Sequence, residues 1–325
     1  MSEKLYLQAS SFQLKAYDNK LNFADSLRKA AEIGYDGATF YGVKNRGEED
    51  YTVEQMNALK QETSMDWLCG NTPSNYEETD SFGVNRYMDK VRYYHIHHLD
   101  FTAPNPFSDT DYAIDYFSKI GCRYISLNNC SLIMPERQDC LNLANYLNYL
   151  GKKAKERGGM KVSWHNHLFE FWPIDEDRVL EILIKNTDPE YVTFELDTSW
   201  CASARVKPEE FIRKYSGRFE LIQFREIDQY FGPQQPGYPE GPNYYITRLN
   251  ENNQIERVPR MQQEADIIFA NCAAGKGILN WEEIVKAGNE QKTVHWIVER
   301  GGTYNYPRDR WKCLEEDYSY YRKLV

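Results

Sequence analysis

Short apolar segments alternate with amphipathic segments along most of the chain. The apolar segments are four to seven residues long, which is the usual length of a buried strand. Residues 23–33 instead show a helical pattern, with Leu27, Ala30 and Ala31 on one face and Gly34 as a stop signal. Eight strands are predicted, at residues 5–10, 37–41, 65–70, 124–127, 161–167, 192–196, 219–224 and 294–298.

Helical patterns follow seven of the eight predicted strands, and the long insertion follows the strand at residues 219–224. Thr52 is a good N-terminal cap for one of them, and Pro208 stands in the first turn of another. Eight strands that each lead into a helix are the pattern of a (β/α)₈ TIM barrel, so we expect an α/β protein with one domain over residues 1–325. The helices are predicted at residues 23–33, 53–62, 111–120, 141–156, 177–185, 208–215 and 318–324.

The composition narrows the classes of function. A formal net charge of −10 argues against nucleic acid as a partner, because nucleic acid is bound by basic surfaces. No run of eighteen apolar residues is present, so we expect no membrane segment, and the first residues lead directly into a strand without a cleavable leader. Seven cysteines without CxxC spacing are expected to be free thiols, which favours a cytoplasmic protein.

Polar residues stand at the ends of the predicted strands. Each of them alone is typical of a solvated loop. In a TIM barrel, however, the carboxyl ends of all strands meet at one face, where the active site lies. Together they therefore predict a polar ring on that face. Its members are Gln8, Ser10, Tyr41, Asn71, Asn128, Asn129, His165, His167, Asp197, Gln223, Arg225 and Glu299.

The sequence WHNHLFEF at residues 164–171 holds two of the six histidines of the chain. His165 and His167 are two positions apart, so on a strand their side chains lie on the same face. This interpretation requires residues 161–167 to be extended. Two imidazoles at the end of a buried strand suit metal binding or proton transfer. A pair of structural histidines is the alternative.

Four passages together resemble the sugar phosphate isomerase/epimerase superfamily, the xylose-isomerase-like TIM barrels. The resemblance extends over nearly the whole chain, but the passages that carry it all follow residue 160. They are HNHLFEF at 165–171, ELDTSW at 195–200, AGKGILNW at 274–281 and WIVERG at 296–301.

The resemblance implies a divalent metal that is held by four residues at strand ends. By position these ligands fall on His165, Asp197, Gln223 and Glu299. Many members of the family have a glutamate where this chain has His165, and a histidine where it has Gln223. A mixed set of nitrogen and oxygen ligands suits Mn²⁺, Co²⁺, Fe²⁺ or Zn²⁺, and we expect Mn²⁺.

The resemblance also implies proton abstraction next to a sugar carbonyl through an enediolate, as in isomerases, epimerases and related lyases. His167 is the candidate base and Glu170 a further catalytic candidate. Arg225 is expected to orient hydroxyl groups or stabilise charge, and a salt bridge to Glu226 or Asp228 is its structural alternative. The candidate substrate-binding residues are Asn129, Asn71, Tyr41 and Gln8.

A long insertion follows the seventh strand at residues 228–271 and is rich in tyrosine and proline. A loop of this length is usually a lid or a binding surface, so we expect it over the barrel mouth or at a partner interface. The cluster HIHH at residues 95–98 is expected to be an exposed turn. With 25 Tyr, 15 Phe and 7 Trp, the chain has many rings that could stack on a ligand.

The substrate is expected to be an unphosphorylated sugar or a keto-sugar glycoside, because no glycine-rich phosphate nest follows the last strands. The insertion is compatible with one branch of the superfamily, the catalytic subunits of C-glycoside deglycosidases. These eliminate an aromatic group from a 3-keto sugar and work with a small partner chain. A homo-oligomer is the other assembly left open. A non-catalytic sugar-binding barrel is the alternative of another class.

Overall fold

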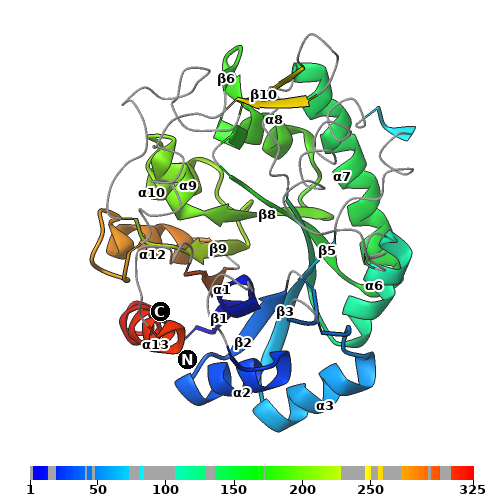
Figure 1. Cartoon of the computed structure of the whole chain (residues 1–325). Coiled ribbons are helices and arrows are strands. Elements are labelled where there is room, and N and C mark those ends of the chain that lie inside the picture. The colour runs from blue at the N-terminus through cyan, green and yellow to red at the C-terminus, as the bar shows by residue number, and fades with distance from the viewer. Residues whose placement is uncertain are drawn as a thin grey trace.

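In the part of the chain that the computed structural model describes, eight parallel strands close into a barrel (Figure 1). The described residues are 3–13, 20–40, 42–45, 48–72, 81–83, 107, 109–128, 136–167, 169–171, 173–227, 246–249, 255–258, 272–291, 294–300 and 309–325. The strands follow one another around the barrel in the order β1-β12-β9-β8-β5-β4-β3-β2, which confirms the predicted TIM barrel. Their bounds are β1 (Leu5–Gln8), β2 (Gly37–Phe40), β3 (Asp66–Asn71), β4 (Tyr124–Asn128), β5 (Lys161–His165), β8 (Val192–Asp197), β9 (Leu221–Phe224) and β12 (His295–Val298).

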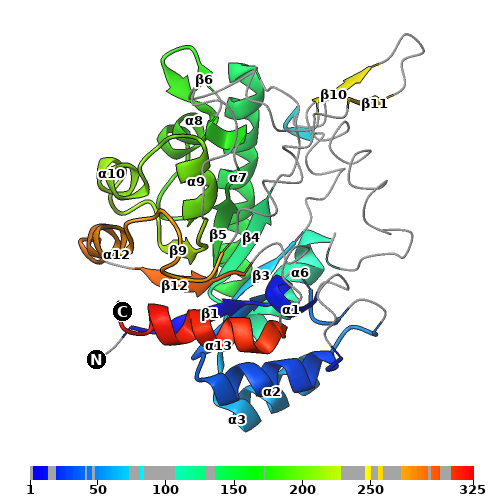
Figure 2. The same cartoon turned by 60° about the vertical axis from the view of Figure 1, so that its left-hand side comes forward.

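Helices pack around the outside of this barrel, as Figures 1 and 2 show from two directions. Several begin and end where local side chains satisfy the free backbone groups. Thr52 and Gln55 form a capping box at the start of α3, and Gly34, with φ 116°, ends α2. The bounds are α1 (Ser10–Gln13), α2 (Phe23–Ile33), α3 (Val53–Thr63), α6 (Thr110–Lys119), α7 (Arg137–Gly158), α8 (Val179–Asn186), α9 (Thr198–Ser203), α10 (Pro208–Lys214), α12 (Trp281–Asn289) and α13 (Arg310–Tyr321).

Alternate residues of the strands face the barrel interior and the helices. On β8, Phe194 and Leu196 belong to the large apolar core between strands and helices, so Glu195 and Asp197 face the interior. A small apolar cluster fills the lower interior. The polar inward residues lie nearer the carboxyl ends of the strands, where the site was predicted. The lower cluster consists of Tyr6, Leu68, Cys69, Tyr124, Leu221 and Ile297.

Strand β5 ends at His165, two residues earlier than predicted. The chain leaves the sheet here because hydrogen bonds to the side chains of Glu170 and Asn166 replace the pairing between strands. The Glu170 carboxylate accepts a hydrogen bond from the backbone N–H of His167 (2.8 Å), and the Asn166 side chain accepts one from the backbone N–H of Asp197 (3.1 Å). The prediction that the strand extends to His167 was therefore wrong, although the rings of His165 and His167 still lie 5.0 Å apart, centre to centre.

Several helix bounds also differ from the prediction. Helix α7 begins at Arg137, four residues early, because Glu136 and Asp139 form a capping box there. Helix α13 begins at Arg310 rather than 318, behind the Asp309 cap. Residues 177–178 do not start a helix, since they pair with β6 (Pro173–Ile174) as the short strand β7 (Asp177–Arg178).

The insertion after β9 contains an antiparallel hairpin of β10 (Ile246–Leu249) and β11 (Ile255–Val258). Figure 2 shows this hairpin standing away from the barrel. The two ends of the insertion meet at its base, where the backbone N–H of Cys272 donates to the carbonyl of Glu226 (3.3 Å). The rest of the insertion and the cluster at 95–98 lie outside the described residues, so their predicted positions stay predictions.

Two expectations about composition can be compared with the described residues. None of the helices in these ranges has the length and apolarity needed to cross a membrane. The six cysteines in these ranges are all buried and free, as expected for thiols without disulfide partners: Cys69, Cys122, Cys140, Cys201, Cys272 and Cys313.

Candidate active site

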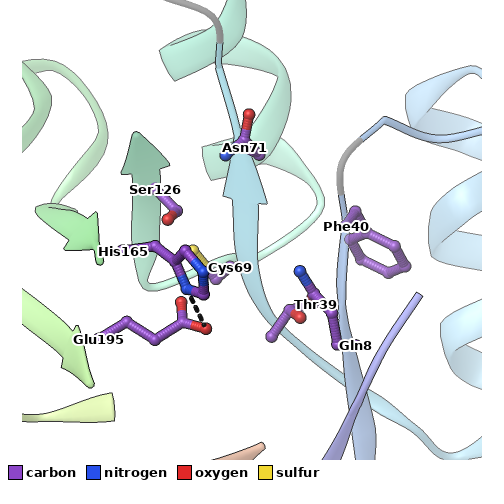
Figure 3. Close-up of a pocket in the computed structure, with 8 residues that line it drawn as sticks. All are labelled: Gln8, Thr39, Phe40, Cys69, Asn71, Ser126, His165 and Glu195. Atoms are coloured by element: carbon purple, nitrogen blue, oxygen red, sulfur yellow. Dashed lines mark hydrogen bonds and ion pairs between the residues drawn. The ribbon is translucent and has the colours of Figure 1, made fainter. Parts of the chain in front are cut away.

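A small pocket opens among the carboxyl ends of the strands (Figure 3). About 220 Å³ of space in and around it, open solvent included, is not filled by protein atoms. Gln8 and Asn71, two of the predicted substrate-binding residues, lie in its wall. The pocket is lined by Gln8, Thr39, Phe40, Cys69, Asn71, Ser126, His165 and Glu195.

His165 and Glu195 form a buried pair at the bottom of this pocket (Figure 3). They stand opposite each other on β5 and β8, and His165 Nδ1 lies 3.2 Å from Glu195 Oε1. Burial by itself lowers the pKa of the imidazole. The charge and hydrogen bond of Glu195 outweigh it and raise the pKa of His165 to about 9. At neutral pH His165 is therefore an imidazolium beside Glu195, and it can donate a proton.

Glu195 was not among the predicted site residues. The sequence does contain a signal for it, because Glu195 stands two positions before Asp197 on a strand of apolar residues. Side chains two apart on a strand share a face, so a carboxylate here had to enter the barrel interior with Asp197. Both side chains are buried, Glu195 at 4% exposure and Asp197 at 0%.

Both carboxylate oxygens of Asp197 have partners. Oδ1 caps α9 by accepting from the backbone N–H of Ser199 (2.8 Å), from its hydroxyl (2.6 Å) and from the backbone N–H of Trp200 (3.2 Å). Oδ2 accepts from Nη1 of Arg225 at 3.0 Å. Asp197 thus fixes the start of α9 and the guanidinium together.

The guanidinium of Arg225 lies between two carboxylates. Its Nη1 atom is 3.0 Å from Oδ2 of Asp197 and 3.6 Å from Oε2 of Glu299. Its Cζ atom lies 5.0 Å from the centre of the Trp200 ring, within range of a cation–π contact. Glu299 is held from the other side, because the Ser10 hydroxyl donates to its Oε1 at 2.7 Å. Arg225 is therefore a fixed cation at the mouth of the barrel.

Glu226, one of the two residues considered as a salt-bridge partner of Arg225, has another role. Its buried carboxylate accepts hydrogen bonds from the Trp281 indole and from the backbone N–H groups of Gly275 (3.2 Å) and Leu279 (3.3 Å). It fastens the AGKGILNW passage to the end of β9. Asp228, the other alternative, lies outside the described residues.

Gln223 is fully buried on β9, in register with Asp197. Its neighbours Ile222 and Phe224 belong to the outer core, so its side chain faces the barrel interior. Neither its amide nitrogen nor its amide oxygen has a hydrogen-bond partner among the described residues. An unsatisfied buried amide costs about 1–3 kcal/mol, so such a group is expected where a ligand is bound.

These side chains do not fit the divalent metal that the resemblance implies. Two predicted ligands, Asp197 and Glu299, are already neutralised by the Arg225 guanidinium. His165 is engaged with Glu195. In the described ranges, no three or more His, Cys, Asp or Glu side chains are arranged to hold a metal.

The two catalytic candidates on the 165–171 passage occupy different environments. The His167 ring is half-buried, with its centre 5.0 Å from the His165 ring and 5.8 Å from the Trp200 ring, so it lies near both rings. Glu170 is buried below the turn, where it accepts from the Trp164 indole (3.3 Å) on the helix-facing side of β5. Burial raises the pKa of Glu170 to about 8 despite its hydrogen bonds. These contacts give Glu170 an anchoring role under His167.

Two of the predicted substrate-binding residues, Tyr41 and Asn129, lie outside the described residues. Their role stays a prediction, as does the binding role of Gln8 and Asn71. Gln8 is buried and its amide oxygen has no hydrogen-bond partner in the described ranges, which makes it a second amide available for a ligand in the pocket.

Comparison with known proteins gives one short sequence match and broad similarity of fold. No protein-family model matches the chain. An inosose dehydratase from Bacillus cereus is 30% identical over 87 residues, which are 27% of this chain and 28% of the relative. The chain thus matches less than a third of the length of that relative.

Similarity to solved structures extends over the whole barrel. A sugar phosphate isomerase/epimerase from Parabacteroides distasonis superposes with a TM-score of 0.67 at 18% identity, over 99% of this chain and 94% of that one. An IolI protein with a bound zinc atom superposes with a TM-score of 0.66 at 11% identity, over 99% and 98% of the two chains. At these identities the likeness is one of fold. The chain has the fold of the xylose-isomerase-like TIM barrels, as its sequence passages predicted.

Proposed function

We propose that this protein is a carbohydrate enzyme that removes a proton next to the carbonyl of an unphosphorylated keto sugar or keto polyol. The observation that carries the proposal is the buried His165–Glu195 pair at the carboxyl ends of the strands, the same face of the barrel at which Arg225 is held by Asp197 and Glu299. The similar proteins named as a sugar phosphate isomerase/epimerase and an inosose dehydratase support the same substrate class. A divalent metal is not part of the proposal, because Arg225 holds two of its predicted ligands.

Proton abstraction next to a carbonyl needs a base and a group that stabilises the developing negative oxygen. His167 is the proposed base, since its ring lies beside both His165 and Trp200. The proton moves to the imidazole, the C–H electron pair forms the C=C bond, and the carbonyl pair moves to oxygen. The Gln223 amide N–H and the Arg225 guanidinium are the donors proposed for that oxygen.

The fate of the enediolate decides the reaction. Isomerisation results if the proton goes to the former carbonyl carbon and the hydroxyl proton of the other carbon passes to the enolate oxygen. Return of the proton to the same carbon from the opposite face gives epimerisation. If a β-hydroxyl leaves as water with a proton from the enzyme, the reaction is a dehydration. The His165 imidazolium is the proposed proton donor, because Glu195 stabilises its charged form. All three outcomes share the first step, so that step is the one to test.

Deuterium exchange measures the first step directly. The protein is incubated in D₂O with ketohexoses, keto-inositols and 3-keto glycosides, and the loss of the proton next to the carbonyl is followed by NMR. At least one substrate should exchange. His167→Ala should lower the rate about 10²–10⁴-fold, while Glu190→Gln, at an exposed surface ion pair, should not change it. Binding without exchange of any substrate would contradict the proposal and favour the non-catalytic sugar-binding barrel.

Three finer proposals concern the glycoside substrate, the oligomeric state and the location of the protein in the cell. Elimination from a 3-keto glycoside with a small partner chain, as in C-glycoside deglycosidases, depends on the tyrosine-rich insertion. The 3-keto glycosides in the exchange assay test this branch. Size-exclusion chromatography with light scattering tests the homo-oligomer, and fractionation of the source cells tests the cytoplasmic location.

A further inference from the structure

The arginine at the barrel mouth sits where the metal of related barrels would be needed. Asp197 and Glu299 come from strands on either side of β9, and both were predicted as metal ligands. In the structure they face the same guanidinium, at 3.0 and 3.6 Å. Asp197 is fully buried and Glu299 is partly buried, with 14% of its side chain exposed. A buried carboxylate requires a positive partner, and here a side chain of the protein itself supplies it.

This guanidinium is held in place by more than the two carboxylates. Asp197 is tied to the N-terminus of α9 by three hydrogen bonds, and the Trp200 ring of that helix lies against the guanidinium. The Ser10 hydroxyl fixes Glu299. A cation with this support keeps its position as charge develops on a substrate, which is the property that electrostatic catalysis requires.

Gln223 provides an independent second observation. It is fully buried, faces the interior, and both of its amide atoms lack hydrogen-bond partners in the described ranges. A neutral amide two residues before Arg225 avoids the repulsion that a protonated histidine would bring, and it is a poorer metal ligand than an imidazole. Its N–H and C=O can instead bind the oxygen and hydroxyl of a sugar.

We infer that the Arg225 guanidinium takes the place of the divalent metal, and that it forms with the Gln223 amide a metal-independent site for the carbonyl oxygen of the substrate. The catalytic part of this inference rests on the proposed function, whereas the exclusion of metal does not. Arg225 is the residue that keeps metal out, so removing it and restoring a histidine at 223 should create a metal site.

Co²⁺ is a suitable probe, because bound Co²⁺ has visible absorption bands. The full chain is stripped with chelator, and binding is measured by equilibrium dialysis and by these bands. Wild type should bind no stoichiometric Co²⁺. The double variant Gln223→His/Arg225→Ala should bind about one equivalent, with a dissociation constant at least 100-fold lower than that of wild type. Gln223→His alone should stay without Co²⁺, and Arg213→Ala, a surface arginine, is the matched control.

Two results would overturn the inference. The first is one equivalent of Co²⁺ in wild type that is lost in Asp197→Asn. The second is a double variant that is folded by circular dichroism and still binds no Co²⁺. If wild type lacks metal but exchanges deuterium with no substrate, the proposed function fails while the exclusion of metal stands. If chelator abolishes exchange and Co²⁺ restores it, exchange is genuine and the metal-independent site is refuted.

Discussion

Replacing the buried Glu170 with glutamine should remove a pH dependence from the free energy of unfolding. Glu170 is 1% exposed, and burial raises its pKa from 4.5 to about 8. Between these two values the unfolded chain releases the proton while the folded protein keeps it. The stability that the protonated form contributes is thus fully present below pH 4.5 and is lost as the pH rises towards 8. The glutamine variant lacks this dependence.

The size of the effect follows from linkage. Between pH 5.5 and 7.5 the unfolded state is deprotonated at this site and the folded state protonated, so each pH unit costs the wild type up to about 1.4 kcal/mol. With the two pKa values above, the free energy of unfolding should fall by about 2–3 kcal/mol more in wild type than in Glu170→Gln over this range. Any constant difference in hydrogen bonding cancels, because only the change with pH is compared.

Urea denaturation followed by tryptophan fluorescence, at pH 5.5, 6.5 and 7.5, measures this difference. A gap between the two proteins that stays constant within about 0.5 kcal/mol would mean that Glu170 is ionised in the folded protein, and would refute the reasoning. Deuterium exchange adds a second readout. Glu170→Gln should keep most of the wild-type rate if the residue anchors the turn, whereas a loss above about 100-fold would identify a catalytic group.

Three further predictions concern other parts of the structure. Asp197→Ala should lower the free energy of unfolding by about 3–5 kcal/mol, because it removes an ion-pair partner of Arg225 and a helix cap. Asp25→Ala, at a surface ion pair, should lower it by less than about 1 kcal/mol, and equal losses in urea denaturation would contradict this. Gly277→Ala should cost about 1–3 kcal/mol by thermal melting, since its Cβ would lie 2.1 Å from a backbone oxygen, and an unchanged melting temperature would disprove the close packing. Deleting residues 231–245 should weaken substrate exchange far more than stability, and a parallel loss of both would show that the loop is structural.

The barrel could be predicted from the sequence because its signals are local. The bounds of α2 were predicted correctly, since one apolar stripe and Gly34 define them. Strand β5 was predicted too long, because the residues that end it, Glu170 and Asn166, act through side chains on backbone groups elsewhere. Helix α9 was missed because its six residues carry no amphipathic pattern of their own and start on the cap of Asp197.

The site was only partly readable for the same reason. Strand-end positions placed His165, Asp197, Gln223 and Glu299 at one mouth of the barrel, which the strand order supports. Which carboxylate pairs with which cation depends on distances across three strands, and no sequence spacing encodes those. The direction of the Arg225 side chain is the clearest case. The adjacent Glu226 is an acid, but its carboxyl group accepts hydrogen bonds from the Trp281 indole and the Gly275 backbone instead.

The backbone contact between Glu226 and Cys272 has a consequence for how this barrel can change over time. It closes the base of the 44-residue excursion 228–271. The two ends of the excursion are therefore held together as the ends of a short turn would be. The entropy of closing such a loop grows slowly with its length, by about 0.6 kcal/mol for each doubling. Shortening, extending or swapping the excursion should therefore be cheap for the scaffold. The excursion should therefore be replaceable, by engineering or in evolution, without changes in the barrel.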